Sequence, residues 1–280
     1  MDGKTCLITG ATSGIGREMA LGLALRGARV IIVGRSPERS AATVRALTAR
    51  TGNSRIECLI ADLSSQASIR ELARTVVATY DRLDVLLNNA GGLYMKRATT
   101  VDGLEMTFAL DHLAYFLLTN LLLPLLRNSA PARVVSTSSG AHTRGRINLD
   151  DLQGARKYGG WKAYAQAKLA NIIFTYELSR KLSGSEVTAN CFHPGLVASG
   201  FAQNNGGLIA LATRLIRPFT ISAPEGAKTG LYLASSPEVE QISGHYFVKE
   251  KPRRSNARSY DRAVAARLWD RSAELTGLTA

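Results

Sequence analysis

Short runs rich in β-branched residues alternate with helical patterns through the first two thirds of this 280-residue chain. The runs that look like buried parallel strands cover residues 5–9, 30–33, 55–61, 85–88, 134–137 and 187–192. Helical patterns lie between them at 15–25, 37–51, 66–80, 103–126 and 161–182. This alternation is typical of parallel strands joined by helices that cover both faces of a sheet. We therefore predict an α/β fold with a doubly wound, central parallel sheet.

The rhythm changes after residue 192, where His193-Pro194-Gly195 ends a strand abruptly. We expect a helix at 223–234, a short strand at 245–248 and an amphipathic helix at 260–275. The apolar segment 206–219 is interpreted either as a lid or as a stretch that touches a membrane surface. No linker divides the chain, so a single domain covering residues 1–280 is predicted.

The composition suits a folded protein with a basic surface. Hydrophobic residues make up 45% of the chain and charged residues 20%, which is enough for a sizeable core. The net charge of +13 comes from basic residues that are scattered along the chain, and the densest run, 249–258, contains Glu250. No nucleic-acid-binding motif accompanies this charge, so a solvated basic surface and no nucleic-acid partner are expected.

The cysteines indicate a reducing compartment, and the apolar segments indicate a protein without a membrane span. Cys6, Cys58 and Cys191 lie far apart in apolar runs, which predicts buried free thiols and no metal site. The first strand begins so early that we expect no signal peptide. The longest apolar stretch, 115–126, is too short to span a bilayer. A soluble, cytoplasmic protein without a transmembrane segment is the prediction.

A glycine-rich turn follows the first strand, where Gly10, Gly14 and Gly16 have the spacing Gly-x-x-x-Gly-x-Gly. Glycines at this place let the backbone approach a pyrophosphate, and the next helix directs its N-terminal N–H groups at it. The residues assigned to the cofactor site in and after this turn are Gly10, Thr12, Ser13, Gly14, Ile15, Gly16 and Arg17. The alternative is a tight turn that binds nothing.

Arg35 indicates which dinucleotide the site prefers. An enzyme that uses NAD usually has a carboxylate at the end of the second strand, whereas this strand ends in Val33-Gly34-Arg35. Arg35 and Arg17 favour a 2′-phosphate through charge-assisted contacts. We therefore predict NADP(H) rather than NAD(H); the alternative for Arg17 is a solvated helix residue.

The third and fourth strands also end in candidate cofactor residues. Asp62 and Leu63 follow the third strand, and the Asp62 carboxylate can accept a hydrogen bond from an adenine amino group. Asn89, Ala90 and Gly91 follow the fourth. Their small side chains allow a cofactor to approach, and an asparagine can tie strand ends together. Both interpretations rest on the rule that ligands bind beyond the carboxyl ends of parallel strands.

Tyr164 and Lys168 are four residues apart and therefore share one face of a helix. The lysine ammonium favours the phenolate, so we expect it to lower the pKa of Tyr164 and make acid–base chemistry possible. Ser139 follows the fifth strand and can hydrogen-bond a substrate carbonyl oxygen. Tyr164 would then protonate that oxygen, and Lys168 would also bind the cofactor ribose.

Together these motifs resemble the short-chain dehydrogenase/reductase family, in the family's order and over nearly the whole chain. The resemblance implies a Rossmann-type fold, with a cofactor half at about 1–130 and a catalytic and substrate half at about 131–280. It implies NAD(P)(H)-dependent carbonyl/alcohol chemistry in which Tyr164 is the acid/base, Ser139 orients the substrate and Lys168 binds the ribose. It also assigns Pro194, Gly195, Val197 and Ser199 to the cofactor site.

A finer resemblance is to the retinol-dehydrogenase-like and WW-domain-oxidoreductase-like branch, which commonly prefers NADP(H). It rests on 112–120, on 168–171, on 193–195 and on the tail from Leu268-Trp269 to Gly277. Asp111 departs from the family, which has an asparagine there whose backbone carbonyl holds a water linked to the lysine. An aspartate could still hold the water, and it adds a negative charge that could weaken the effect of Lys168 on Tyr164. Ser199 replaces the usual threonine and keeps its hydroxyl.

The loops around the predicted nicotinamide site are apolar and aromatic, which favours a lipophilic aldehyde, ketone or alcohol as substrate. The residues expected there are Leu93, Tyr94, Met95, His142, Tyr158, Trp161, Phe201 and Leu208. The family resemblance implies a homodimer or homotetramer. Two alternatives stay open at this stage: a catalytically weak nicotinamide-binding regulatory protein, and a serine hydrolase that uses Ser139 with a histidine.

Overall fold

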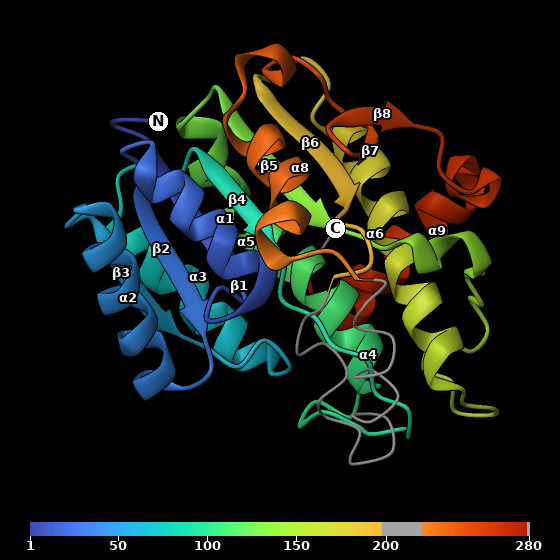
Figure 1. The fold of residues 1–280 in the computed structure, drawn as a ribbon. Helices are drawn as coiled ribbons and strands as arrows, with labels where there is room; N and C mark the ends of the chain where they lie inside the picture. The colour runs from blue at the N-terminus through green and yellow to red at the C-terminus, as the bar shows by residue number, and fades with distance from the viewer. Residues whose placement is uncertain (198–219, 279–280) are drawn as a thin grey trace.

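One sheet of eight strands forms the centre of the protein, in the order β3-β2-β1-β4-β5-β6-β7-β8 (Figure 1). It is described here from a computed structural model that covers residues 1–197 and 220–278. The strands are β1 (Thr5–Thr9), β2 (Arg29–Gly34), β3 (Ile56–Ile60), β4 (Val85–Asn88), β5 (Ala132–Thr137), β6 (Val187–His193), β7 (Tyr246–Val248) and β8 (Lys251–Arg253). β1 to β7 are parallel, which confirms the predicted doubly wound sheet. β8 is antiparallel to β7 and was not predicted, because a Lys-Pro-Arg edge strand carries no β-branched signal.

Helices cover both faces of this sheet. α1 (Gly14–Leu25), α2 (Pro37–Thr51) and α8 (Ala223–Ser235) pack on one face. α3 (Gln66–Thr79), α5 (Ala114–Asn128) and α6 (Gly160–Lys181) pack on the other, and α9 (Arg262–Thr276) lies outside α5 and α6 (Figure 1). Alternate residues of each strand face opposite sides of the sheet, and both sides are buried. In β1, Cys6 and Ile8 face the core under α1 and α8, while Leu7 faces the core under α3 and α5.

The predicted helix at 103–126 begins three residues later than expected. Thr99 and Glu105 form a β-bridge, and the chain turns between them, because the Thr100 N–H donates to the Leu104 carbonyl at 2.8 Å. The Glu105 carboxylate then caps the short helix α4 (Met106–Phe108) by accepting from the N–H groups of Thr107 and Phe108. A carboxylate cap and the bridge before it stop the helix from extending further towards the N-terminus.

A π-helical turn, Ala109–Leu113, joins α4 to α5 and makes a continuous helix from Met106 to Asn128. By length and composition this 23-residue helix could cross a membrane, contrary to the expectation that the apolar stretch is too short. In the fold, 72% of its most apolar window is buried against the rest of the protein, as in the core helix of a globular domain.

Candidate active site

The carboxyl ends of β1, β4, β5 and β6 lie at one edge of the sheet, and the predicted site residues follow each of them (Figure 1). Successive strands are added on one side of β1 as far as β3 and on its other side from β4 onwards. Open α/β sheets bind their ligands at the point where the strand order reverses in this way, here between β1 and β4. The glycine turn follows β1, Asn89 follows β4, Ser139 follows β5 and Pro194 follows β6. The fold therefore brings together motifs that are far apart in the sequence, from Gly10 to Pro194.

The glycine turn is packed so closely that side chains would fill it. A Cβ atom at Gly16 would lie 2.4 Å from the Gly10 carbonyl oxygen and 2.5 Å from Asn89 Nδ2, and one at Gly10 would lie 2.7 Å from Ala90 Cα. Asn89 Nδ2 donates to the carbonyls of Thr9 at 3.0 Å and Gly10 at 3.3 Å, so the predicted tie between strand ends is confirmed. This close approach of two backbones leaves the mouth of the turn open for a diphosphate.

Helix α1 begins at this turn. Ser13 is its N-cap residue, and its side chain makes no capping hydrogen bond within the described part of the chain. The first N–H groups of α1, at Gly14, Ile15 and Gly16, therefore remain without an intrahelical or a side-chain cap partner there. Together with the positive end of the helix dipole they fit the pyrophosphate of a dinucleotide.

Thr12 links the glycine turn to the end of β2, since a Cβ atom at Gly34 would lie 2.6 Å from Thr12 Cγ2. Arg35 follows Gly34, is exposed, and makes no hydrogen bond or ion pair with residues 1–197 or 220–278. Arg17 is less available, because its Nη2 atom lies 3.1 Å from the Glu18 carboxylate. Of the two predicted guanidinium groups, Arg35 is therefore the better placed to meet a 2′-phosphate.

Asp62 and Leu63 follow β3, as predicted, but one carboxylate oxygen of Asp62 is already hydrogen-bonded and the Leu63 side chain is buried. Asp62 is exposed, and its Oδ1 atom accepts from the Ser64 N–H at 3.0 Å and the Ser64 hydroxyl at 2.8 Å. The other carboxylate oxygen is left for an adenine amino group. The Leu63 side chain is buried in the core between the sheet and α3, so only its backbone is available to a ligand.

Ser139, Tyr164 and Lys168 come together at the ends of β5 and α6. Tyr164 and Lys168 lie on successive turns of α6 and are almost fully buried. The Ser139 hydroxyl hydrogen-bonds the Tyr164 phenol and also accepts from the Ala141 N–H at 3.2 Å. Two hydroxyl groups and an ammonium therefore converge where the sequence predicts them.

Asp111 completes this group. Its Oδ2 atom lies 3.0 Å from Lys168 Nζ, and its Oδ1 atom accepts from the Gly92 N–H at 2.7 Å. Its backbone carbonyl, which the family resemblance assigns to a water, accepts from Asn171 Nδ2 at 2.8 Å. Gly91 makes room for the pair, since a Cβ atom there would lie 3.0 Å from Asp111 Oδ1 and 3.2 Å from Lys168 Nζ.

The electrostatics of this group differ from the prediction. Burial raises the pKa of Tyr164 above its usual value of 10, the Asp111 carboxylate raises it further, and the hydrogen bond from Ser139 opposes both. Burial also raises the pKa of Asp111, against the opposing effect of Lys168. The expectation that Lys168 lowers the pKa of Tyr164 is wrong for this arrangement. Lys168 Nζ is 5.5 Å from the centre of the Tyr164 ring, and its charge is paired with Asp111.

Comparison with known proteins identifies the family. The model of the short chain dehydrogenase family matches residues 4–207. The chain belongs to the short-chain dehydrogenase family. It is 43% identical to retinol dehydrogenase 12 of Mus musculus over 99% of this chain and 87% of that protein. It is 42% identical to retinol dehydrogenase 13 of Homo sapiens over 99% of this chain and 86% of that one.

Solved structures agree with the fold. A putative uncharacterized protein from Mycobacterium paratuberculosis is 36% identical, with a TM-score of 0.81 over 99% of this chain and 94% of that chain. The active-site complex of Pseudomonas aeruginosa RhlG with NADP is 30% identical, with a TM-score of 0.71 over 88% of this chain and 94% of that chain. This short-chain dehydrogenase is therefore an oxidoreductase that acts on alcohol and carbonyl groups, built on a Rossmann-like sheet.

Three segments that carry predicted cofactor residues of the dehydrogenase meet at Gly226. A Cβ atom at Gly226 would lie 2.6 Å from Val197 Cγ2, 3.1 Å from Ile15 Cγ2 and 3.5 Å from the Pro194 carbonyl oxygen. The loop after β6 and the glycine turn are therefore in contact with the start of α8, which brings together three of the predicted cofactor residues. Gly195 lies in the same loop, and Ser199 lies outside the described residues.

His142 is not a pocket residue, contrary to prediction. It is buried, its Nδ1 atom lies 2.7 Å from the Ser139 carbonyl oxygen, and its Nε2 atom accepts from the Asn256 N–H at 3.2 Å. Both ring nitrogens thus hold the loop after β5 against the C-terminal tail. His142 meets the backbone of Ser139 and not its hydroxyl, so these two residues do not form the serine–histidine pair of a hydrolase.

Trp161 lies beside Tyr164, and the other described residues predicted for the pocket lie in the loops after β4 and before α6. The Tyr158 hydroxyl lies 2.6 Å from the Tyr94 carbonyl oxygen and 3.1 Å from Glu105 Oε1, so it ties the loop before α6 to the loop after β4. Trp161 is 60% exposed, and its ring centre is 6.5 Å from that of Tyr164. Leu93 is buried and Met95 is half-buried. Phe201, Leu208 and the segment 206–219 lie outside the described residues.

The prediction did not include Gly92, Asn171 and Gly226 as site residues. Asn171 stands in the motif Lys168-Leu169-Ala170-Asn171, and its position one turn after Lys168 is the one signal that could have found it. Gly92 and Gly226 act through close contact with residues distant in the chain, which no local pattern shows.

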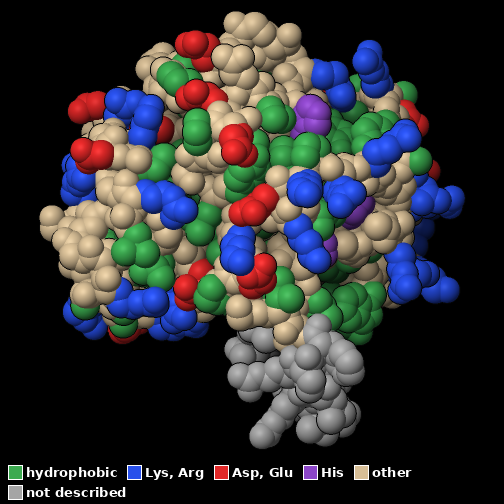
Figure 2. Space-filling view, turned by 45° about the horizontal axis from the view of Figure 1, so that its top comes forward, with side chains coloured by type: hydrophobic (Ala, Val, Ile, Leu, Met, Phe, Trp, Pro, Cys, Tyr) green, Lys and Arg blue, Asp and Glu red, His purple; other side chains and the backbone are tan. Residues whose placement is uncertain are grey.

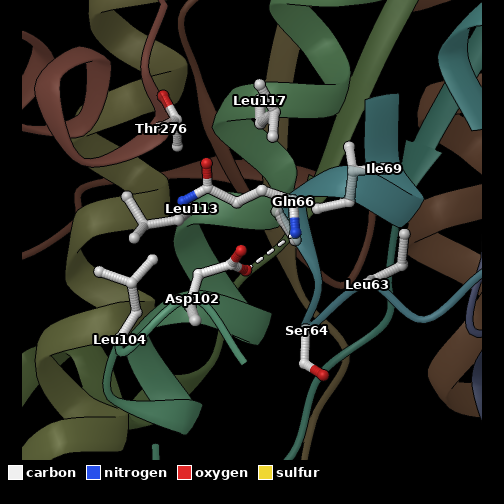
Figure 3. A pocket seen from close by; sticks show the side chains of 11 residues that line it. Leu63, Ser64, Gln66, Ile69, Asp102, Leu104, Leu113, Leu117 and Thr276 are labelled. Carbon is white, nitrogen blue, oxygen red and sulfur yellow. Dashed lines mark hydrogen bonds between the residues drawn. The ribbon is translucent and has the colours of Figure 1, made fainter. Parts of the chain in front are cut away.

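A hollow between α3 and the start of α5 lies apart from the catalytic residues (Figure 3). It is mostly apolar, it has room for about one water molecule, and the Gln66 N–H donates to Asp102 across it at 2.9 Å.

No group of three or more potential metal ligands occurs within residues 1–197 and 220–278. On the face shown in Figure 2, Lys and Arg side chains are spread widely, and Asp and Glu side chains lie between some of them.

Proposed function

We propose that this protein uses NADP(H) to interconvert a carbonyl and an alcohol on a lipophilic small molecule. The observation that carries the proposal is the convergence of Ser139, Tyr164 and Lys168 beside the glycine turn. Exposed Trp161 next to Tyr164 supports an apolar substrate, as do relatives that are called retinol dehydrogenases. Related structures that are complexes with NADP support the cofactor.

The residues present fit a nicotinamide dinucleotide. The crowded turn at Gly10 and Gly16 admits a pyrophosphate at the start of α1, Asp62 can accept from adenine, and Arg35 can meet a 2′-phosphate. The Lys168 ammonium would hold ribose hydroxyls. When bound, such a cofactor supplies or accepts the hydride.

The chain itself handles the proton. The Ser139 hydroxyl orients the substrate oxygen, and the Tyr164 phenol delivers a proton to it or removes one from it. Because burial and Asp111 raise its pKa, Tyr164 carries its proton at neutral pH and is a donor there.

The test of the reaction is consumption of NADPH with a panel of lipophilic aldehydes and ketones. Tyr164→Phe should abolish turnover and retain NADPH binding, measured by fluorescence titration. Tyr232→Phe is the matched control, since Tyr232 of α8 donates to Glu238 in the turn that follows this helix and should keep full activity. Equal activity of the Tyr164→Phe protein and the wild type would remove Tyr164 from the mechanism.

The test of cofactor choice is Arg35→Asp. Loss of a charge-assisted contact is worth about 1.5–3 kcal/mol, so the preference for NADPH over NADH should fall by about tenfold or more. Arg45→Asp, at an exposed position of the following helix α2, should leave the preference unchanged. If Arg35→Asp also leaves it unchanged, Arg35 does not recognise the 2′-phosphate.

A catalytically weak, nicotinamide-binding regulatory protein is the second candidate. The pairing of Lys168 with Asp111 favours it, because this pairing removes the charge that would activate Tyr164. Tight NADPH binding with no turnover of any substrate in the panel would support this alternative. A homodimer or homotetramer and a cytoplasmic location stay predictions.

A further inference from the structure

Asp111 is held in place by partners on three sides. The carboxylate is fully buried and lies between Lys168 Nζ, at 3.0 Å, and the Gly92 N–H, at 2.7 Å. Its carbonyl is held by Asn171, which also reaches the Thr137 carbonyl at 3.3 Å. Asp111 lies in the π-helical turn, and there its carboxylate reaches Lys168 while its carbonyl reaches Asn171, both on α6.

Asp111, His112 and Tyr115, all on the α4–α5 helix, interact electrostatically with Tyr164 or Lys168. Glu105 and Tyr94 act on Asp111, while His142 and His193 contact the backbone of Ser139 and Gly140. Glu105 is committed to its helix cap, and burial lowers the pKa of both His112 and His193 to about 4, which keeps them neutral at pH 7. Asp111 is therefore the acidic group that contacts the lysine.

The Asp111–Lys168 ion pair determines the electrostatic environment of the Tyr164 phenol. Ionised Tyr164 would add a second negative charge near the Asp111 carboxylate, and the single positive charge of Lys168 is already balanced by that carboxylate. Carbonyl reduction needs the protonated phenol, since the substrate carbon gains a hydride from the reduced cofactor while its oxygen takes the Tyr164 proton. The phenolate that remains is reprotonated from water. Alcohol oxidation needs the phenolate before the alcohol can lose its proton.

We propose that Asp111 is a positioning residue that biases this enzyme toward carbonyl reduction at neutral pH, by pairing with Lys168 so that Tyr164 retains its proton. The inference rests on the proposed function and adds a direction to it. Oxidation should gain rate only as the pH rises toward the ionisation of Tyr164, while reduction should be fast at neutral pH.

Asp111→Asn tests the bias, because the amide can still accept from Gly92 but carries no charge. We expect the pH profile of its kcat for oxidation to move about one pH unit or more to lower pH, so that this kcat rises about tenfold or more near pH 7.5. Asp84→Asn is the matched control. Asp84 is also a buried carboxylate that pairs with a lysine, Lys4 at 3.0 Å, but at the opposite edge of the sheet. Its profile should match the wild type.

A second readout uses the cofactor-free protein. The nine tyrosines are labelled with ¹³C at Cζ, and the Tyr164 signal is assigned from Tyr164→Phe. We expect Tyr164 to stay protonated beyond about pH 10 in the wild type and to ionise about one unit or more lower in Asp111→Asn. Ionisation of wild-type Tyr164 near neutral pH, or the same titration in both proteins, would overturn the role of Asp111.

The two readouts separate this inference from the proposed function. If no substrate is turned over, the proposed function fails, while the titration of Tyr164 still decides whether Asp111 controls its proton. If Asp111→Asn does not fold, as judged by circular dichroism, the wild-type titration alone decides, because early ionisation of Tyr164 contradicts the inference by itself.

Discussion

Acid should destabilise this protein through His112. The ring is fully buried in the π-helical turn, with Nδ1 3.2 Å from Asn171 Oδ1 and Nε2 3.0 Å from the Ser272 hydroxyl of α9. The pKa of His112 is lowered from 6.5 to about 4, mainly because the ring is buried; the hydrogen bond to Asn171 Oδ1 opposes this shift and the nearby Lys168 charge adds to it. Burial therefore favours the neutral ring in the native state, where it links the π-helical turn to α6 and α9.

The size of the effect follows from linkage. Because the folded pKa is depressed, the unfolded chain takes up the proton first as the pH falls below 6.5. The free energy of unfolding then falls by ~1.4 kcal/mol per pH unit until the folded histidine is protonated near pH 4. The total loss is ~3 kcal/mol, of which ~2 kcal/mol has occurred at about pH 5. Above about pH 7.5 the stabilisation is fully present.

Urea unfolding of the wild type and of His112→Asn at about pH 7.5 and pH 5 measures this effect. An asparagine cannot titrate but can still hydrogen-bond, so its cost should be similar at both pH values. His142, His193 and the carboxylates titrate in both proteins and cancel in the comparison. The variant should lose ~2 kcal/mol less than the wild type between the two pH values. Equal losses would refute the buried neutral histidine as the cause.

Three local changes test other parts of the site. Gly16→Ala should weaken NADPH binding about tenfold or more, because the new Cβ atom would lie 2.4 Å from the Gly10 carbonyl oxygen; fluorescence titration measures it. Tyr158→Phe should cost ~1 kcal/mol of stability in urea unfolding and raise KM more than it lowers kcat, since it unties the loop that carries Tyr94. Trp161→Ala should raise KM for long-chain substrates and leave NADPH binding unchanged, as judged by the same titration and by steady-state kinetics.

Local patterns in the sequence predicted most of the elements well. Helix α2 and strand β4 have the predicted bounds, 37–51 and 85–88, because Ser36 and Pro37 start the helix and apolar β-branched and leucine residues make the strand. The α4–α5 helix was predicted too early, because the cap at Glu105 depends on a bridge to Thr99 that no periodicity reveals.

The candidate site divides in the same way. The four-residue spacing of Tyr164 and Lys168 and the glycine turn are local features, and strand–helix alternation with parallel pairing is enough to bring Ser139 to the same edge of the sheet. The role of His142 could not be predicted, because its partner Asn256 lies more than 100 residues away.

The sequence by itself determined the fold class, the family resemblance and the residues that gather at the edge of the sheet, because helix and strand periods and turn chemistry act over a few neighbouring residues. Only the tertiary structure decided what those residues do to one another. Asp111 contacts Lys168 directly because a π-helical turn, Gly92 and Asn171 hold it there. The charge that Tyr164 meets depends on burial and on distances of a few ångströms between separate elements, and the order of residues along the chain does not specify those distances.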